Sequence, residues 1–430
     1  MAKTQKITPF LWFDNQAEEA ANFYVSVFKK SKIAKTVKHG DRVSVVNFSL
    51  GGQSFTALNG GPQFKFNPSI SFFVACKTLA ETKTVWKKLS EGGMVMMPLS
   101  KYDWSEQYGW VQDKYGLSWQ VMLGPFDYTN QKIIPSFLFT GPQRGQGEAA
   151  IRFYTTVFGE NAAIDNLSQY GPGQAGPEGT LQFAAFHLGE QSFSAMDNPQ
   201  TEAQFTFNEA ISFVINCKGQ KEVDFYWDKL TADGGQESQC AWLKDKFGVS
   251  WQVVPDALPK LLGDADPAVA QRAMANMMQM KKINIRKLKS EPKKVNITVK
   301  TTVNAPVEKA WKHFTTPADI EQWNAASPDW HCPKAANDLR KGGAFSYTMA
   351  ARDGSFSFDF GGTYDEVIEN QLIAYTMEDG RKAKVVFKAK GGRTEVVETF
   401  EAEQMNPNEM QRGGWQAILD NYKGQTEAAQ

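Results

Sequence analysis

Two short stretches with nearly the same sequence place polar residues where chemistry could occur. DKYGLSWQV occupies residues 113–121, and DKFGVSWQV occupies residues 245–253. Each stretch places a glutamine, Gln120 or Gln252, between a tryptophan and a valine. A glutamine side chain can both donate and accept hydrogen bonds, but it is a poor substitute for a carboxylate. The two stretches therefore predict hydrogen-bonding positions rather than charged ones.

A second candidate for chemistry is the histidine–cysteine pair in DWHCPKA, residues 329–335. His331 and Cys332 are residue types found in metal sites and in nucleophilic dyads. A dyad needs the imidazole within about 3 Å of the sulfur, and neighbours in sequence rarely reach that geometry. Two adjacent residues also need further ligands before they can hold a metal. We therefore predict packing, or a contact at the mouth of a cavity, for Trp330 and His331.

The first stretch is preceded by an aromatic segment, PLSKYDWSEQYGW, which is longer than its counterpart QCAW in the second half of the chain. Its rings include Trp104, Tyr108 and Trp110. Such a segment could form a lid over a ligand pocket. It could equally pack against the second copy, and the sequence leaves both possibilities open.

A duplication of the first two thirds of the chain must position these residues. Five blocks recur in the same order over about 5–125 and 132–256, a period too long for a solenoid. The pairs are AANFYVSVF with AAIRFYTTVF, LGGQSF with LGEQSF, ISFFVACK with ISFVINCK, VWKKLSEGG with YWDKLTADGG, and the two opening stretches. In each copy, apolar alternation and i,i+4 spacing predict a strand, a helix and three strands, twice over.

This organisation resembles the vicinal-oxygen-chelate superfamily, which includes glyoxalase I, bleomycin-resistance proteins and extradiol dioxygenases. The nearer resemblance is to the PhnB-like branch, on ITPFLWF, FYVSVF, WSEQYGWVQDKYGLSWQV and QRAMANMMQMKKINI. The resemblance implies paired βαβββ modules that build a cupped sheet around a small-molecule cavity. That branch is often labelled a demethylubiquinone methyltransferase. A methyltransferase usually holds its methyl donor at a glycine-rich turn after a parallel strand, whereas the glycine doublets here fall at predicted hairpins and helix ends.

In metal-dependent relatives, four strand positions supply histidine and glutamate ligands inside the cup. In this chain we place these positions at Pro9 and Pro135, at Thr56–Leu58 and Ser194–Met196, near Ser69 and Ala210, and at Gln120 and Gln252. None of these residues is a strong ligand for a divalent ion. The histidines of this region, His39 and His187, are interpreted as structural. We therefore predict that neither copy holds the family metal and that the chain uses no cofactor.

The sequence pattern changes after the basic stretch KKINIRKLKSEPKK, residues 281–294, which we interpret as a linker. VNITVKTTV alternates as a strand does, and two short helices, several strand-like runs and a helix from Glu409 to Tyr422 follow. This order resembles the START-like helix-grip fold. The nearest family is the activator-of-Hsp-ATPase-homologue branch of the SRPBCC superfamily, on APVEKAWKHFTTPADIEQW, DFGGTYDEV, ETFEAE and GGWQAILDNYK. That family wraps a curved sheet around its last helix and often leaves an apolar cavity.

Aromatic residues of this last segment are candidates for the wall of such a cavity. They are Phe345, Tyr347, Phe358, Phe360, Tyr364 and Trp415. We expect about half of them to be ordinary core, as large rings usually are. Gly413 and Gly414 each lower the stability of the final helix by about 1 kcal/mol, which predicts a close approach of its backbone to the sheet or to a ligand.

Composition excludes several classes of protein. Lys+Arg and Asp+Glu both number 47, so no global field favours nucleic acid or an anionic membrane. No apolar run approaches the roughly 20 residues that a membrane span needs, and the N-terminus lacks the apolar core of a signal peptide. The 4 cysteines are widely spaced, without a CxxC pair, which fits a reducing compartment. We predict a cytoplasmic protein.

These observations predict three α+β domains. Two are PhnB-like vicinal-oxygen-chelate domains, residues 1–128 and 129–256; a helical tail and basic linker, 257–294, leads to a helix-grip domain, 295–430. We expect the two repeats to pair within the chain. Whether the chain also forms a homo-oligomer is left open.

The favoured function is metal-independent binding of a small, partly apolar organic molecule in cupped-sheet and helix-grip cavities, as in sequestration or resistance. The residues predicted to contact this ligand are Trp104, Tyr108, Trp110, Gln120, Gln252, Trp330, His331, Tyr347, Phe360 and Trp415. One alternative is a metal-independent lyase or isomerase of glyoxalase type, with Asp103, Glu106 or His331 as its acid or base. Another is a chaperone-type or regulatory module with a protein partner. We predict no nucleic-acid or membrane partner, and the residues leave open whether any reaction is catalysed.

Overall fold

The structure is a computed structural model of the whole chain, which divides into two compact units, Met1–Ser290 and Glu291–Gln430. The described residues are 5–39, 42–124, 129, 131–200, 205–290, 294–403 and 406–429. The predicted domain end at residue 128 and residues 291–293 of the predicted linker lie outside the described residues. Helices and sheets are mixed in both units, in agreement with the predicted α+β class.

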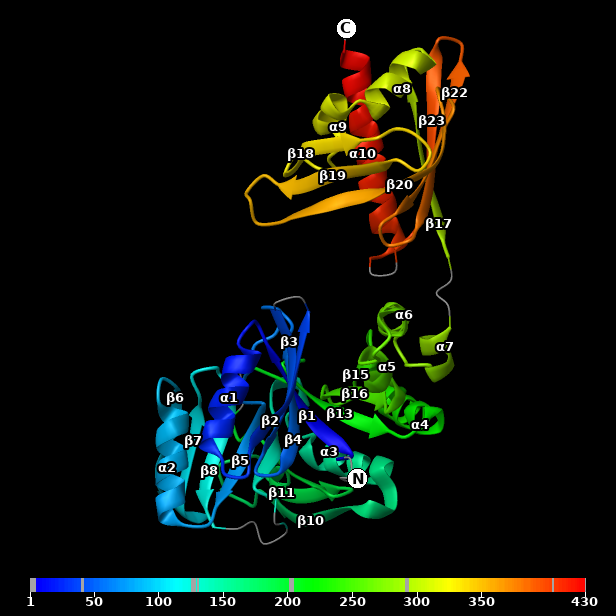
Figure 1. Cartoon of the computed structure of the whole chain (residues 1–430). Helices are drawn as coiled ribbons and strands as arrows, with labels where there is room; N and C mark the ends of the chain where they lie inside the picture. The colour runs from blue at the N-terminus through cyan, green and yellow to red at the C-terminus, as the bar shows by residue number, and fades with distance from the viewer. Residues whose placement is uncertain are drawn as a thin grey trace. The chain divides into compact units, whose positions relative to one another are not determined.

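The first unit contains two sheets of eight strands each (Figure 1). The first sheet has the order β14-β15-β16-β13-β1-β4-β3-β2. Its strands are β1 (Ile7–Phe13), β2 (Lys32–His39), β3 (Arg42–Leu50), β4 (Gln53–Asn59), β13 (Ile211–Cys217), β14 (Gln236–Glu237), β15 (Trp242–Lys244) and β16 (Ser250–Pro255). The second sheet has the order β10-β11-β12-β9-β5-β8-β7-β6. Its strands are β5 (Ile70–Cys76), β6 (Met94–Tyr102), β7 (Ser105–Gln112), β8 (Ser118–Leu123), β9 (Ile133–Phe139), β10 (Ala162–Gln169), β11 (Leu181–Leu188) and β12 (Gln191–Asp197).

The two sequence copies exchange modules to build these sheets. We predicted that each copy would form its own cup. Instead β1 pairs antiparallel with β13, with Ile7 opposite Ile215, and β5 pairs antiparallel with β9, with Ile70 opposite Phe137. The first module of each copy therefore shares a sheet with the second module of the other copy. The predicted intrachain pair of repeats is confirmed.

Helices cover one face of each sheet, and their buried side chains pack with those of the strands to form the main hydrophobic core of the unit. They are α1 (Ala17–Val27), α2 (Leu79–Ser90), α3 (Gly147–Phe158) and α4 (Gln220–Thr231). Trp119 and Trp251 are fully buried on this face, where their rings pack against Tyr24 of α1 and Tyr154 of α3. We call the opposite face of each sheet the inner face. The chain after β16 forms α5 (Ala257–Leu262), α6 (Pro267–Met278) and α7 (Ile285–Lys289).

The repeated stretch DKxGxSWQV is a turn held together by its aspartate. The Oδ1 atom of Asp245 accepts hydrogen bonds from the backbone nitrogens of Phe247 (2.8 Å) and Val249 (3.1 Å). Its Oδ2 atom accepts from the indole nitrogen of Trp251 at 2.8 Å. Gly248 lies between them with φ +87°, a value that suits glycine. Asp113 accepts the same three hydrogen bonds in the first copy.

The second unit is one antiparallel sheet of seven strands with the order β17-β23-β22-β21-β20-β19-β18. The strands are β17 (Asn296–Val303), β18 (Trp330–Asn337), β19 (Ala344–Ala351), β20 (Ser357–Ile368), β21 (Leu372–Met377), β22 (Lys382–Lys390) and β23 (Arg393–Glu401). The helices are α8 (Val307–Thr315), α9 (Pro317–Trp323) and α10 (Asn408–Ala428). Helix α10 crosses one face of the curved sheet (Figure 1), where Leu419 and Tyr422 join the core. This is the helix-grip arrangement that the sequence predicted.

Two predictions from the sequence concern the helices. A Cβ atom added at Gly413 or Gly414 of α10 would meet no atom of another element within 4 Å, so the predicted close approach of this backbone to the sheet is wrong. None of the helices formed by described residues has the length and apolar composition required to span a bilayer.

Candidate functional site

A row of serines crosses the inner face of the second sheet. Their side chains are in register on β12, β9, β5 and β8, and the row consists of Ser194, Ser136, Ser71 and Ser118. None of them is more than 1 % exposed. The Oγ atoms of Ser136 and Ser194 are buried and have no hydrogen-bond partner among the described residues. The row is therefore a buried polar strip whose hydrogen-bonding capacity is only partly used.

Gln120 connects this row to the aromatic segment. Its Nε2 atom donates to Ser71 Oγ at 2.7 Å, and its Oε1 atom accepts from the hydroxyl of Tyr108 at 2.5 Å. The indole of Trp110 donates to the hydroxyl of Ser118 at 2.7 Å. The aromatic segment is a hairpin of β6 and β7, which brings Tyr108, Trp110 and Gln120 together. Trp104 at its turn is 60 % exposed.

The two unpartnered serines allow a stability prediction. Ser136→Ala and Ser194→Ala should each raise the free energy of unfolding by about 1 kcal/mol, because each removes a buried hydroxyl that has lost its water without gaining a partner. Ser71→Ala is the matched control and should lower it by about 1–2 kcal/mol, since it leaves the amide of Gln120 without its acceptor. Urea denaturation at neutral pH measures all three. Destabilisation by the first two variants would show that these hydroxyls have partners.

The first sheet has different side chains at the equivalent positions. Phe10 lies in register with Thr56 and with Ser212, and the amide of Gln252 donates to Ser212 Oγ at 3.0 Å. The ring of Phe10 packs edge-on against Trp242 with 5.6 Å between ring centroids. An aromatic ring therefore occupies the place that Ser136 has in the second sheet.

The strand register corrects the predicted metal-ligand positions. Pro9 and Pro135 lie opposite Phe213 and Phe72, on the helix-covered face, because neighbouring residues of a strand point to opposite faces. The inner-face residues at this level are instead Phe10 and Ser136. On the strands beside them, the residues in register are Ser212 and Ser71, two positions after the predicted Ala210 and Ser69.

These positions do not fit the divalent metal of the superfamily. They hold hydroxyls, a phenyl ring and amides, and the Gln120 amide already has two protein partners. Across the described residues, no group of three His, Cys, Asp or Glu side chains could hold a metal ion. His187 pairs with Asp165 at 2.9 Å, and the side chain of His39 lies outside the described residues. Glu106, one of the candidate bases, forms an exposed ion pair with Lys101.

A cavity of about 330 Å³, partly open to solvent, lies in the second unit between the sheet and α10. All six aromatic residues predicted for its wall line it: Phe345, Tyr347, Phe358, Phe360, Tyr364 and Trp415. The other lining residues are Phe314, Thr315, Trp323, Asn324, Asn337, Met349, Ile373, Tyr375, Arg381, Glu398, Glu403, Asn406, Gln411 and Ile418. A volume of this size suits a small organic molecule.

One wall of the cavity contains a chain of hydroxyls. Tyr364 donates to Asn337 Oδ1 at 2.7 Å, and the Asn337 amide donates to the carbonyl of Thr315 at 2.6 Å. The hydroxyl of Tyr347 lies 3.5 Å from that of Tyr364. Burial raises the pKa of Tyr347 and raises that of Tyr364 to about 12, so both phenols stay neutral. They can give hydrogen bonds to a ligand or accept them.

A buried carboxyl is the second polar feature of the cavity. Glu398 on β23 is 7 % exposed, and its Oε1 atom accepts a hydrogen bond from Tyr375 at 3.2 Å. Burial raises the pKa of this carboxyl to about 7, although the Tyr375 hydrogen bond favours the charged form. Glu398 can therefore change its charge near neutral pH. Such a group is a candidate for function.

The histidine–cysteine pair is not part of this cavity lining. Trp330 and His331 are part of strand β18, and neither lines the cavity. Cys332 is 3 % exposed, and burial raises the pKa of its thiol, which disfavours the nucleophilic thiolate. The ring of Trp330 packs edge-on against Phe358, which does line the cavity, at 6.0 Å between centroids.

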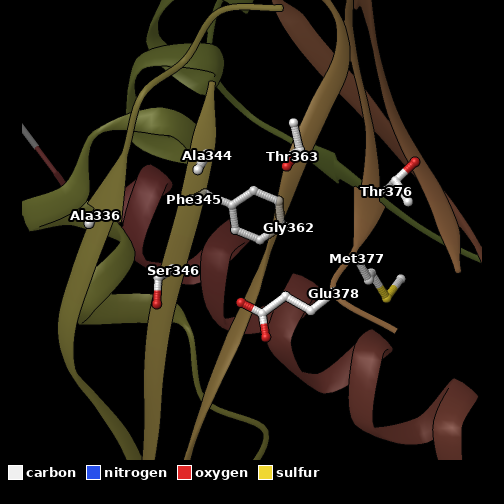
Figure 2. Close-up of a pocket in the computed structure, with 9 residues that line it drawn as sticks. All are labelled: Ala336, Ala344, Phe345, Ser346, Gly362, Thr363, Thr376, Met377 and Glu378. Atoms are coloured by element: carbon white, nitrogen blue, oxygen red, sulfur yellow. The ribbon is translucent and has the colours of Figure 1, made fainter. Parts of the chain in front are cut away.

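The outer face of the same sheet carries a shallower hollow (Figure 2). Gly362 of β20 lines it, and Figure 2 shows Phe345 and Glu378 beside it. A Cβ atom at Gly361 would come within 2.8 Å of Glu378 Oε1. Phe345 lines both this hollow and the inner cavity. We take the cavity between the sheet and α10 as the candidate binding site, because it is mostly apolar with a few convergent polar groups.

Sequence reasoning missed the polar residues of the cavity, namely Glu398, Tyr375 and Asn337. A signal for Glu398 was available. Val396, Glu398 and Phe400 alternate along β23, and the two apolar residues are buried. A glutamate at the central position of that alternation must point to the core. Tyr375 and Asn337 are ordinary strand residues in sequence and give no such signal.

Comparison with known proteins gave matches for both parts of the chain. The family model described as 3-demethylubiquinone-9 3-methyltransferase matches residues 5–122 and 131–254. The model described as Activator of Hsp90 ATPase homolog 1-like protein matches residues 304–424. A comparison with curated proteins gave no match. Both resemblances inferred from the sequence are confirmed.

Three solved structures illustrate these similarities. A PhnB protein from Bacillus cereus is 40 % identical over 28 % of this chain and 100 % of its own, with a TM-score of 0.27. An AHSA1-like protein from Aeromonas hydrophila is 41 % identical over 31 % of this chain and 93 % of its own, with a TM-score of 0.30. A protein from Cytophaga hutchinsonii is 55 % identical over 31 % of this chain and 92 % of its own, with a TM-score of 0.29.

Proposed function

The chain belongs to the family described as 3-demethylubiquinone-9 3-methyltransferase, with a C-terminal segment that matches the Activator of Hsp90 ATPase homolog 1-like family, and from this premise we propose that it binds a small, partly apolar organic molecule. At the level of these families, the chain is a small-molecule-binding or regulatory module. The finer proposal is that binding takes place in the cavity between the sheet and α10 of the second unit and needs no metal. The observation that supports it is the aromatic lining of a cavity of about 330 Å³.

The methyltransferase description does not lead us to propose methyl transfer. The doublet Gly51-Gly52 forms the β3–β4 hairpin turn, with φ of +59° and +91°. Gly92 follows the end of α2 with φ +72°. Both places need glycine for the turn itself. Neither is the turn between a parallel strand and a helix that would hold a nucleotide-like methyl donor.

Filling the cavity should weaken binding. Ile418 lines it from α10, and Ile418→Trp should weaken the binding of the apolar fluorophore N-phenyl-1-naphthylamine at least tenfold, about 1.4 kcal/mol. Gln425→Trp is the matched control, because this exposed residue lies on the same helix. Fluorescence titration of the full chain measures both affinities. Equal binding by the two variants, or no binding by the unmodified chain, would contradict the proposal.

A metal-independent lyase or isomerase is the second candidate function. Glu398 favours it, since a carboxyl with a pKa of about 7 that faces a cavity is suited to proton transfer near neutral pH. Native mass spectrometry of the purified chain would reveal a co-purified organic molecule. A change in that molecule's mass with time, absent in Glu398→Gln, would favour this candidate over binding alone.

We also propose the domain organisation 1–128, 129–256, 257–294 and 295–430 as divisions of the sequence. The first two of these segments exchange modules in the structure. The cytoplasmic location remains a proposal based on cysteine usage. Cys76, Cys217, Cys240 and Cys332 are all free thiols. That state fits a reducing compartment.

A further inference from the structure

Glu398 occupies a position that the fold would normally give to an apolar side chain. On β23 it lies between the buried Val396 and Phe400. Its partners in register on the adjacent strands are Val299 of β17 and Val385 of β22, which are 2 % and 0 % exposed. A carboxyl at such a position loses most of its hydration. The side chain therefore needs a partner to compensate for that loss.

Within the described residues, only one of the two carboxylate oxygens of Glu398 has a hydrogen-bond partner. Glu398 Oε1 accepts from the hydroxyl of Tyr375, whereas Oε2 has no hydrogen bond to any described residue. The cationic side chain in the cavity lining is Arg381, and its groups are used elsewhere: Nε donates to Asp379 at 2.7 Å and Nη1 donates to the carbonyl of Glu401 at 3.1 Å. The remaining ionisable lining residue besides the tyrosines, Glu403, carries a carboxyl group and is therefore not a cation. A buried carboxylate without a cation leaves a place for one in the ligand.

The walls around this carboxyl are suited to a cation. Phe345 stands within 5.1–5.8 Å of Tyr347, Tyr364, Tyr375 and Phe360, measured between ring centroids. Trp415 of α10 stacks on Phe400 at 3.9 Å and meets Phe360 edge-on at 5.9 Å. Ring faces attract ammonium groups through their quadrupoles, most strongly where water is excluded. A neutral ligand would gain the apolar contacts of these rings but not this attraction.

We propose that the cavity selects an organic cation, an ammonium group on an apolar body, with the carboxylate of Glu398 as its counter-ion. This inference rests on the proposed binding function and specifies its ligand class. The ammonium group lies against Glu398 Oε2 and among the tyrosine rings, and the apolar body lies toward Trp415 and Ile418.

The proposal predicts a pH dependence of binding. The ionisable groups that face Glu398 are Tyr375 of β21 and Tyr347 of β19. Other ionisable groups of the lining are Tyr364, Arg381 and Glu403. The adjacent strands β17 and β22 present valines, and α10 presents Trp415 and Ile418. Because the pKa of Glu398 is about 7 and an alkylamine stays protonated below pH ~10, the ionised fraction of Glu398 governs binding. The apparent affinity should rise about tenfold between pH 6 and pH 8.

Three probes of one shape test the ligand class on the full chain. They are 4-phenylbutylamine, 4-phenyl-1-butanol and 4-phenylbutyrate, titrated by calorimetry at pH 6 and pH 8. At pH 8 the amine should bind at least tenfold more tightly than the alcohol, and the butyrate should bind most weakly. In Glu398→Gln the preference for the amine should disappear while the alcohol still binds, which also shows that the variant is folded. Glu395→Gln is the matched control, because this carboxylate lies on the same strand and pairs with Lys390 instead.

The outcomes separate this inference from the proposed function. If the alcohol binds as tightly as the amine, or if the amine preference survives in Glu398→Gln, the cation proposal is wrong and the binding function stands. If the amine affinity does not change between pH 6 and pH 8, the counter-ion role of Glu398 is wrong. If none of the probes binds, both the inference and the binding function are wrong.

Discussion

Replacing Asp245 by alanine is expected to lower the free energy of unfolding of the first unit by about 4 kcal/mol. The carboxylate accepts four hydrogen bonds: from the backbone nitrogens of Phe247 and Val249, from the Trp251 indole and from the Tyr154 hydroxyl, the last at 2.8 Å. Alanine would leave all four donors buried without an acceptor. Because each such donor costs about 1–3 kcal/mol, this variant should be among the most destabilising in the chain.

Hydrogen exchange along a urea series can assign this loss to peptides of residues 5–290. Two controls isolate its origin. Tyr154→Phe removes one of the four hydrogen bonds and should cost about 1 kcal/mol. Asp228→Ala removes an exposed aspartate that pairs with Lys282 and should change stability by less than about 1 kcal/mol. If Asp245→Ala proved no more damaging than Asp228→Ala, the aspartate would not be what holds the turn.

The hydrogen bond between Asp245 and Tyr154 also joins two elements that are far apart in the sequence. Tyr154 belongs to α3, which packs on the second sheet, whereas Asp245 precedes β16 of the first sheet. The hydrogen bond between them therefore links the two sheets as well as closing a turn. The glutamines that suggested a chemical site lie on the opposite face of their strands from these tryptophans. Sequence alone could identify the repeat, but not that its aspartate is the structural residue.

The elements and their faces were predictable because alternation and helical spacing are local signals. The exchange of modules was not. Strand β1 pairs with the start of ISFVINC in the second copy, but the first copy offers ISFFVAC, with the same first three residues and the same final cysteine. Either pairing would bury the same apolar pattern, so hydrophobic periodicity cannot choose between them.

Some residues of the candidate site were likewise predictable from the sequence, and others were not. The aromatic wall of the helix-grip cavity was predictable, since rings on alternate positions of several strands must converge on the face that α10 covers. The serine row was not predictable, because it depends on a register across four strands. Glu398 was predictable from alternation in β23. It was overlooked because a glutamate in a strand is usually on the solvent face.

A titration of stability against pH gives the second large expected effect. The pKa of Glu398 is raised from 4.5 to about 7 in the folded chain. Below pH 4.5 the carboxyl is protonated in both the folded and the unfolded state, so it has no effect on the difference between them. As pH rises from 4.5 to 7, the unfolded state loses its proton first. The second unit should therefore lose stability over this range, by about 3 kcal/mol in total, and should reach a plateau above pH 7.

Glu398→Gln should remove this loss, because the amide does not titrate. At pH 8 the variant should be more stable than the unmodified chain by about 2–3 kcal/mol, and at pH 4 the two should be nearly equal. Hydrogen exchange of peptides from residues 294–429 along a urea series at each pH measures the difference. Glu395→Gln should follow the unmodified chain closely, since Glu395 pairs with Lys390 outside the cavity. Parallel pH profiles for Glu398→Gln and the unmodified chain would mean that the carboxyl is solvated.

The direction of this effect also bears on the ligand. A neutral molecule in the cavity would stabilise the second unit equally at pH 5 and pH 8, since its affinity does not depend on the charge of Glu398. A cation would stabilise it more at pH 8, where Glu398 is ionised, and would thereby restore the stability lost between pH 4.5 and 7. The carboxyl that weakens the empty fold above neutral pH would then be the group that a cationic ligand requires. Unfolding free energies with and without 4-phenylbutylamine at the two pH values distinguish the cases.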